Sequence, residues 1–279
     1  MHPAVTRESA QFVDAHVHIR EGKGLDDIAA AGVTAVRDAG SREGVGLAVS
    51  RRRPNAAPAV VTAGWALVKK GGYGSLFGVP VETRDEIRSE ILRLRRAGAG
   101  IIKVMASGMV SLKKTGTVTP GGFDRDDLGF IIDEAASHGL TVMAHANGER
   151  AIIAAAEAGA RSIEHGFFMS ERAIGVLAKE RAFWVPTVTA LKRAADAGGA
   201  SKEAKDFVAG LIRSHLSLLR LAHESGVLLA VGTDCVLPAP SYREAYESEL
   251  RYFEQAGISP DKVTRIACEG GAKLLGLDL

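Results

Sequence analysis

Short apolar runs rich in β-branched residues alternate along the chain with longer amphipathic stretches. Runs of this kind predict buried strands, and apolar residues recurring every three or four positions predict helices. Eight runs fit strands, at 12–19, 34–40, 58–67, 100–108, 141–148, 162–166, 182–188 and 228–235. Helical patterns lie between them at 25–32, 44–53, 83–98, 124–139, 148–159, 170–180 and 201–226, and two more follow the eighth strand at 241–256 and 260–275.

Glycines close several of the predicted helices, at Gly32, Gly98, Gly139, Gly159 and Gly226. Glycine tolerates a positive φ, which ends a helix and leads the chain into the next strand. The alternation of eight strands with helices predicts an α/β fold, the (β/α)8 TIM barrel. A doubly wound open sheet is the alternative, but no G-x-G-x-x-G follows the first strand. Because no linker divides the chain, we expect residues 1–279 to form a single barrel domain.

Composition and charge narrow the class of protein. Hydrophobic residues make up 46% of the chain, and 35 basic against 33 acidic residues leave a net charge of +2. This balance gives no reason to expect a nucleic-acid or membrane partner, and Arg51, Arg52 and Arg53 fit a solvated helix end. The first residues lack a signal-peptide pattern, and no apolar run reaches the length of about 18 residues that a membrane span needs. Cys235 and Cys268 cannot form a disulfide scaffold, so we expect a cytoplasmic protein.

Ionisable residues gather where the predicted strands end. In a barrel the functional face lies at the carboxyl ends of the strands. The residues there are His16, His18, Lys103, His145, His165 and Asp234. Because side chains alternate along a strand, His16 and His18 face the same way, into the barrel mouth. Buried imidazoles without partners are costly, whereas a divalent cation satisfies them, and imidazole with carboxylate suits zinc.

A structural interpretation competes with this one. A single buried histidine is more often a hydrogen-bonding core residue than a ligand. We assign that role, or a solvated one, to His2, His138, His215 and His223. Lys103 has two interpretations: an ammonium that binds a substrate carboxylate, or a neutral amine that adds carbon dioxide to form a carbamate. The grouping of all six residues at strand ends favours a metal site.

The segments "DAHVH", "IIKVMASG", "AHANG", "IEHG" and "VGTD", in that order, carry a resemblance to a known family. The chain resembles the metal-dependent amidohydrolase superfamily, in the branch that holds imidazolonepropionase-like and Xaa-Pro dipeptidase-like enzymes. The resemblance implies two divalent ions, with His16, His18 and Asp234 on one and His145 and His165 on the other. Carbamylated Lys103 would bridge them, and Zn²⁺ is the expected ion. Members usually carry an accessory β-sandwich, for which this chain leaves no room around the barrel, so we expect a barrel alone.

The same set predicts a hydrolase that cleaves an amide-type C–N bond. Metal-bound water is acidic enough to supply hydroxide, and Asp234 is the expected general acid and base. His145 and His165 would hold the ion that polarises the carbonyl. Asp38 and Glu164 are candidates for orienting the imidazoles, while Asp14 either does the same or lies at the lower rim.

Two long segments between strand and helix predict the substrate contacts. They carry Lys69 with Tyr73 and Lys113, and Arg20 follows the first strand; solvated loops are the competing interpretation. A dipeptide, an N-acyl amino acid or a cyclic amide fits as a small-molecule substrate, and we expect a homo-oligomer. A metal-dependent decarboxylase, an esterase or lactonase, and a non-catalytic binding barrel are the alternatives.

Overall fold

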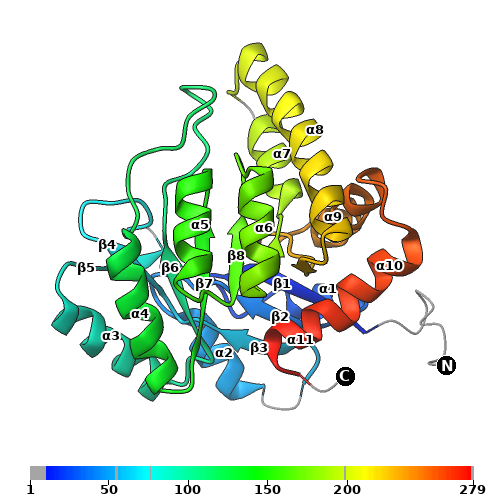
Figure 1. Cartoon of the computed structure of the whole chain (residues 1–279). Coiled ribbons are helices and arrows are strands. Elements are labelled where there is room, and N and C mark those ends of the chain that lie inside the picture. The colour runs from blue at the N-terminus through cyan, green and yellow to red at the C-terminus, as the bar shows by residue number, and fades with distance from the viewer. Residues whose placement is uncertain (1–10, 54–55, 76, 198, 278–279) are drawn as a thin grey trace.

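The computed structural model describes residues 11–53, 56–75, 77–197 and 199–277. Figure 1 shows parallel strands at the centre with helices around them. The strands are β1 (Phe12–Ile19), β2 (Val33–Asp38), β3 (Ala59–Thr62), β4 (Ala66–Lys69), β5 (Gly78–Val81), β6 (Ile101–Met105), β7 (Thr141–Ala146), β8 (Ser162–His165), β9 (Phe183–Val185), β10 (Leu228–Leu229) and β11 (Cys235–Leu237). The helices are α1 (Leu25–Ala30), α2 (Val45–Arg52), α3 (Arg84–Ala97), α4 (Arg125–Ser137), α5 (Glu149–Glu157), α6 (Glu171–Glu180), α7 (Val188–Asp196), α8 (Lys202–Glu224), α9 (Tyr242–Gln255), α10 (Pro260–Arg265) and α11 (Gly271–Leu275), with a π-helical turn at Ile266–Gly270.

The strands form two parallel sheets that together make a (β/α)8 TIM barrel, as predicted. One sheet has the order β11-β1-β2-β3, and the other has the order β10-β9-β8-β7-β6-β4-β5. The segment between β10 and β11 bonds to β1 and so links the two sheets: the N–H of Ala15 donates to Val231, and the N–H of Asp234 donates to His16. All strands formed by the described residues belong to these two sheets.

Two predicted strands are interrupted in the structure. The predicted strand 58–67 is divided into β3, which pairs with β2, and β4, which pairs with β6. The chain bends between them at Gly64, whose φ of +71° suits glycine. The predicted strand 228–235 is likewise divided into β10 and β11, which belong to different sheets. Where a strand is interrupted depends on the strand with which each segment pairs. The hydrophobic pattern of the local sequence does not contain that information.

Other boundaries also differ. The predicted strand 182–188 ends early, because Thr187 has a φ of +50° and α7 begins directly after it. The sequence pattern did not predict α7, nor β5, which lies inside a segment expected to be a loop. The five predicted helix-closing glycines all have positive φ. Arg51 and Arg52 end α2 as exposed residues, as predicted, whereas Arg53 follows the helix and is half-buried.

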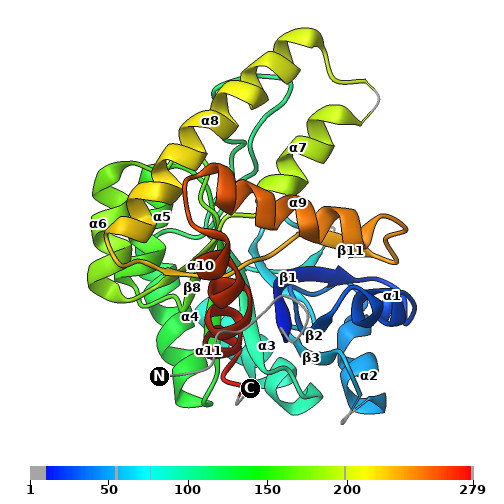
Figure 2. The same ribbon diagram turned by 90° about the vertical axis from the view of Figure 1, so that its right-hand side faces the viewer.

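Helices α7 and α8 form a hairpin on the carboxyl-end side of the barrel. Figure 2 shows α8 extending away from the strands, with α7 beside it. Val110, from the segment between β6 and α4, packs with Leu191 of α7 and Val208 of α8 in a small apolar cluster. This cluster therefore covers one side of the barrel mouth. No helix formed by the described residues is long and apolar enough to cross a membrane.

Candidate metal centre

His16 and His18 lie on β1, and their rings are fixed by β8 and by the turn after β2. His16 is 1% exposed and its Nδ1 lies 2.7 Å from Glu164 Oε2. His18 is 8% exposed and its Nδ1 lies 2.6 Å from the carbonyl oxygen of Gly40. With Nδ1 donating in both rings, each Nε2 is left with a lone pair for a cation. The alternation of β1 thus places two matched ligand atoms on one side, as predicted.

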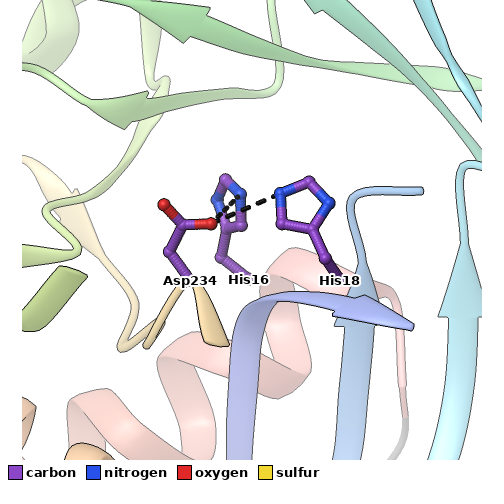
Figure 3. A group of neighbouring side chains, drawn as sticks. All are labelled: His16, His18 and Asp234. Atoms are coloured by element: carbon purple, nitrogen blue, oxygen red, sulfur yellow. Dashed lines mark ion pairs between the residues drawn. The ribbon is translucent and has the colours of Figure 1, made fainter. Parts of the chain in front are cut away.

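Asp234 completes a group of three candidate ligands. Its Oδ1 lies 3.5 Å from His16 Nε2 and 3.3 Å from His18 Nε2, as Figure 3 shows. This is the one group of three or more His, Cys, Asp or Glu residues, within the described part of the chain, whose ligand atoms all lie within 4.8 Å of one another. Two imidazole nitrogens and a carboxylate oxygen at this spacing suit a divalent transition metal such as zinc.

His145 and His165 lie beside this group and have neutral hydrogen-bond partners, and Asp234 Oδ2 lies 4.0 Å from His165 Nδ1. Their ring centroids are 4.5 Å apart, and that of His165 is 5.1 Å from His16. His145 Nε2 lies 2.9 Å from the carbonyl oxygen of Gly108, and His165 Nδ1 lies 2.7 Å from Thr187 Oγ1. In each ring the opposite nitrogen remains available to a cation.

The imidazoles of the site have altered acidity. Burial and the nearby Lys103 lower the pKa of His16 to about 4 and that of His145 to about 3. Burial and His145 lower the pKa of His165 well below its usual value. Burial also lowers the pKa of His18, but Asp234 outweighs it, and the pKa of His18 is raised. Three of the four rings are therefore neutral at pH 7, which is the form that binds metals.

Lys103 stands on β6 and lines the same cavity as these residues. It is 1% exposed, and its Nζ has no hydrogen-bond partner among the described residues. Burial lowers its pKa to about 8, against the opposing pull of Glu164 and Asp234. A buried ammonium without partners is strongly disfavoured. The site therefore has an unsatisfied position that a covalent change at Nζ or a bound group would fill.

Glu164 connects the ligands to a buried arginine. Its Oε1 accepts a hydrogen bond of 2.7 Å from Arg37 Nη2 and one from the Ser162 hydroxyl, while Oε2 faces His16. Burial would raise the pKa of Glu164, but Arg37 and His16 lower it to about 2. The predicted role of Glu164 in orienting an imidazole is confirmed. Arg37 was missed, although an arginine inside an apolar strand was the signal.

Asp38 and Asp14 have different positions from Glu164. Asp38 accepts hydrogen bonds from the backbone of Ile19 and Gly40 and from Thr62 Oγ1, so it holds the turn whose carbonyl meets His18. Asp14 accepts from Thr233 and from the Tyr242 hydroxyl, and its one bond to His16 is from the backbone N–H. The pairing register of β1 and β2 shifts between Asp14 and Val17, which separates Asp14 from the alternation of the ligands. Asp14 therefore joins β1 to the segment before β11 and to α9, and among the described residues its side chain bonds to no imidazole.

Backbone strain gathers at the same place. Five residues other than glycine have a positive φ in the described chain, and three of them are His165, Thr187 and Asp234. Such a conformation costs about 1–3 kcal/mol per residue and persists where the surroundings impose it. Strained backbone at a strand end is typical of functional sites.

Glu249 of α9 supports the segment that carries Thr187. Its two carboxylate oxygens accept hydrogen bonds from the backbone N–H groups of Val188 and Thr189, at 2.9 and 2.8 Å. It is fully buried, and burial raises its pKa to about 7. Glu249 thus caps the first turn of α7 and fixes the position of Thr187.

A cavity of about 560 Å³ opens above the ligands. The predicted contacts Tyr73 and Arg20 line it, and burial raises the pKa of Tyr73 to about 12, so its hydroxyl stays protonated. Lys69 does not line it, because its ammonium pairs with Asp124 and Asp127, and Lys113 is exposed elsewhere. Sequence reasoning missed other lining residues: Asn147, Thr187 and Arg193.

The side chains of the remaining histidines that the structure describes do not line the cavity, although His215 bonds to the backbone of His165. His138 closes α4, and His215 is a buried residue stacked against Phe167 with its ring centroid 4.5 Å away. His223 lies near the end of α8. The structural roles predicted for these three are consistent with those positions. His2 lies outside the described residues.

Comparison with known proteins identifies the family. The amidohydrolase family model matches residues 10–279, and the chain therefore belongs to the amidohydrolase family. Ochratoxinase of Aspergillus niger is 28% identical over 237 residues, which are 75% of this chain and 48% of that protein. An uncharacterized protein of Mycobacterium tuberculosis is 26% identical over 95% of this chain and 73% of its own length. The chain thus spans about half the length of the curated ochratoxinase that it matches.

Solved structures show the same fold. The crystal structure of A. niger ochratoxinase has a TM-score of 0.81 at 23% identity, covering 95% of this chain and 71% of that one. A Xaa-Pro dipeptidase with methionine bound in its active site also has a TM-score of 0.81, at 22% identity, covering 96% of this chain and 75% of that one. An amidohydrolase structure at 26% identity has a TM-score of 0.78, with coverages of 96% and 75%.

Proposed function

We propose that this protein is a metal-dependent hydrolase that cleaves an amide-type C–N bond of a small molecule. The observation that carries the proposal is the gathering of His16, His18 and Asp234 within 4.8 Å at the carboxyl end of the barrel, next to His145, His165 and Lys103. Amide hydrolysis requires an activated water and a polarised carbonyl. A cluster of four imidazoles, three of them neutral, and one carboxylate beneath an open cavity is suited to both.

The donor set fits two divalent ions, and Zn²⁺ is the ion we propose. His16, His18 and Asp234 would hold one ion, His145 and His165 the other, and Lys103 would contact both. The unpartnered Lys103 Nζ and the nitrogens left free in each ring are the observations that support this fit. When bound, such ions make water more acidic and polarise a carbonyl.

Asp234 is the residue we assign to proton transfer. Burial would raise its pKa, but the surrounding imidazoles of His16 and His18 lower it below its usual value, so its carboxylate is ionised. An ionised carboxylate at the ligand cluster accepts a proton from the attacking water at Oδ1 or Oδ2 and returns it to the departing nitrogen. The protonated Tyr73 hydroxyl lines the cavity and is placed to donate a hydrogen bond to the substrate.

Carbamylation of Lys103 is a further part of the proposal. The neutral Nζ forms a bond to the carbon of carbon dioxide and releases one proton, which leaves an anionic carbamate. This change replaces a buried cation that has no partner with an anion among ligands for cations. Burial, which lowers the pKa of Lys103 to about 8, makes the neutral amine accessible near pH 7.

The related proteins support an amide as substrate. One is named ochratoxinase, and one neighbour is a prolidase solved with N-methylphosphonate-L-proline. Because the chain spans about half of the former and is 24% identical to the latter, these names support the reaction class and leave the substrate open. A cytoplasmic location and a homo-oligomer stay predictions.

Metal analysis and a substrate panel test the proposal together. Protein produced with zinc should hold about two equivalents of tightly bound metal, and less than one equivalent would contradict it. The panel measures amine, alcohol and carbon dioxide release separately. Amine release supports the proposal, whereas alcohol release alone indicates an esterase or lactonase, and carbon dioxide release indicates a decarboxylase.

Asp234→Asn tests the proton-transfer role. It should keep most of the bound metal, because an amide oxygen still ligates, and lower kcat by about 10²–10⁴-fold. Turnover that survives this change would contradict the assignment.

Lys103→Ala should lose metal and activity, and a short-chain carboxylic acid should restore part of both. Lys113→Ala is the matched control, because Lys113 is exposed and lies outside the cavity. Asn147→Asp is unsuitable as a control, because Asn147 contacts His145.

A further inference from the structure

Asn147 follows the end of β7, two residues after His145, and its side chain meets two neighbouring strand ends. It is 4% exposed. Its Nδ2 donates a hydrogen bond of 3.2 Å to the carbonyl oxygen of Gly108, which lies in the segment after β6. Its Oδ1 accepts one of 3.1 Å from the backbone N–H of Phe167, which lies in the segment after β8. One buried amide therefore connects the carboxyl ends of β6, β7 and β8.

The two partners fix the orientation of this amide. The N–H of Phe167 requires an acceptor and the carbonyl of Gly108 requires a donor, so Oδ1 faces the former and Nδ2 faces the latter. The opposite orientation would place oxygen against oxygen and N–H against N–H. Each buried group left unpaired in this way costs about 1–3 kcal/mol. The amide of Asn147 therefore has one orientation in which both of its ends are satisfied.

The carbonyl oxygen of Gly108 is the point at which the amide reaches His145. The Nε2 atom of His145 lies 2.9 Å from this oxygen, and Ser107 Oγ donates to it at 2.9 Å. Ser107 Oγ also accepts from the backbone N–H of Asn147 at 2.7 Å. A carbonyl oxygen only accepts, so Nε2 of His145 carries the proton and Nδ1 keeps its lone pair. The amide and the hydroxyl therefore hold the carbonyl that selects the tautomer of His145.

Gly108 is also the residue at which a hairpin beside the cavity begins. Val110, which lines the cavity, forms an antiparallel bridge with Val118 in the returning half of this hairpin. A Cβ atom at Gly108 would lie 2.0 Å from the carbonyl oxygen of Thr119, so this position admits only glycine. Glycine has no side chain to anchor its own backbone. The position of its carbonyl therefore depends on the donors that surround it.

We propose that Asn147 is a positioning residue for the second metal ion. It fixes the Gly108 carbonyl, this carbonyl holds the ring of His145 at Nε2, and Nδ1 remains as the ligand atom. The inference rests on the proposed two-ion site and names the residue through which one of its ligands is set. Glu164 and Asn147 then have parallel roles. The carboxylate orients His16 directly, whereas the amide orients His145 through a backbone carbonyl.

Stepwise zinc binding to the full chain tests the role of Asn147. Asn147→Leu replaces the amide by a side chain of similar size that neither donates nor accepts a hydrogen bond. One zinc equivalent should bind about tenfold more weakly, near the lower limit for the loss of such contacts. The other equivalent, at His16, His18 and Asp234, should bind as it does in the wild type. Competition with a chelator measures both affinities. Two unchanged affinities would overturn the proposal, and so would an equal loss in both, because it would indicate a structural role.

Two serines of the segment after β6 provide a matched pair of variants. Ser107→Ala removes the second donor to the Gly108 carbonyl and should weaken the same zinc equivalent. This variant carries the test if Asn147→Leu does not fold. Ser111→Ala makes the same chemical change where the hydroxyl accepts only from the backbone N–H of Lys114, and it should leave both affinities unchanged. Equal zinc affinities in the two serine variants would contradict the proposal.

A measurement on the metal-free protein keeps this inference distinct from the proposed function. The buried Nε2–H of His145 should give a resolved signal in proton–nitrogen correlation spectra of histidine-labelled protein, and its loss in His145→Gln identifies it. In Asn147→Leu this proton should exchange with water about tenfold faster, since tenfold corresponds to one lost hydrogen bond. An unchanged exchange rate would refute the role of Asn147. If the wild-type protein binds no zinc, the proposed function fails, and this comparison still decides the inference.

Discussion

The two halves of the proposed ligand set, His16 with His18 and His145 with His165, are held by different means. His16 is fixed by the ionised Glu164, which is paired in turn with buried Arg37. His165 is fixed by the neutral Thr187, whose segment is held by Glu249. The two glutamates are equally buried, yet an arginine lowers the pKa of one, and burial raises that of the other. The difference shows that the position of His16 depends on the charge pair of Glu164 and Arg37 inside the barrel. The position of His165 depends on the capping of α7 by Glu249.

The largest effect is expected from breaking the charge pair. Arg37→Ala leaves the Glu164 carboxylate buried without its guanidinium, and this should destabilise the metal-free protein by about 3–5 kcal/mol. Denaturant unfolding measures it. Arg96→Ala, at an exposed position in α3, is the control and should change stability by less than about 0.5 kcal/mol. A loss below about 1 kcal/mol in Arg37→Ala would contradict the importance of the pair.

The free energy of unfolding should depend on pH through Glu249, which supports the half of the site that contains His165. Its folded pKa of about 7 exceeds the ordinary 4.5, so the folded state binds this proton more tightly than the unfolded state does. The resulting stability is fully present below pH 4.5 and is lost as the pH rises to about 7. The loss is on the order of 3 kcal/mol. Unfolding of wild type and Glu249→Gln from pH 4.5 to 8 measures it, and parallel curves for the two proteins would refute the assignment.

Glu164→Gln distinguishes charge from hydrogen bonding in the first half. The amide can still accept from His16 but no longer carries the charge that makes the ligand more basic. Zinc affinity should fall by up to about 100-fold, as measured by competition with a chelator. An unchanged affinity would show that the charge of Glu164 matters only for folding.

Thr187→Val gives the smallest expected effect. The shape is retained, and the partner of His165 Nδ1 is lost, so zinc affinity should fall by about tenfold, near the lower limit for such contacts. The same chelator competition measures it. If this variant binds zinc more weakly than Glu164→Gln does, the comparison between the two halves is reversed.

The sequence predicted the side chains that face the cavity better than those that support them. The strand-end positions of His16, His18, His145, His165 and Asp234 follow from the period of two and the barrel topology. Glu164 could be anticipated because it precedes a ligand on the same strand. Glu249 could not, since it meets α7 across 61 residues of sequence, and no local pattern encodes such a contact. Arg193 was missed for a related reason: it lies on α7, which the periodicity did not predict.

The division of the last strand into β10 and β11 has a further consequence for how this barrel can tolerate change. Asp234 and Cys235 are joined to β1, whereas Leu228 and Leu229 are joined to β9. The acidic ligand is therefore carried by the same sheet as His16 and His18. An insertion or deletion of one residue among residues 16–20 would shift the alternation of side chains along β1, so that His18 would no longer face the same side as His16. Length changes in the other sheet would leave His16, His18 and Asp234 in place. In directed evolution, length variation should accordingly survive in the segments after β4 and β6 and be eliminated from β1.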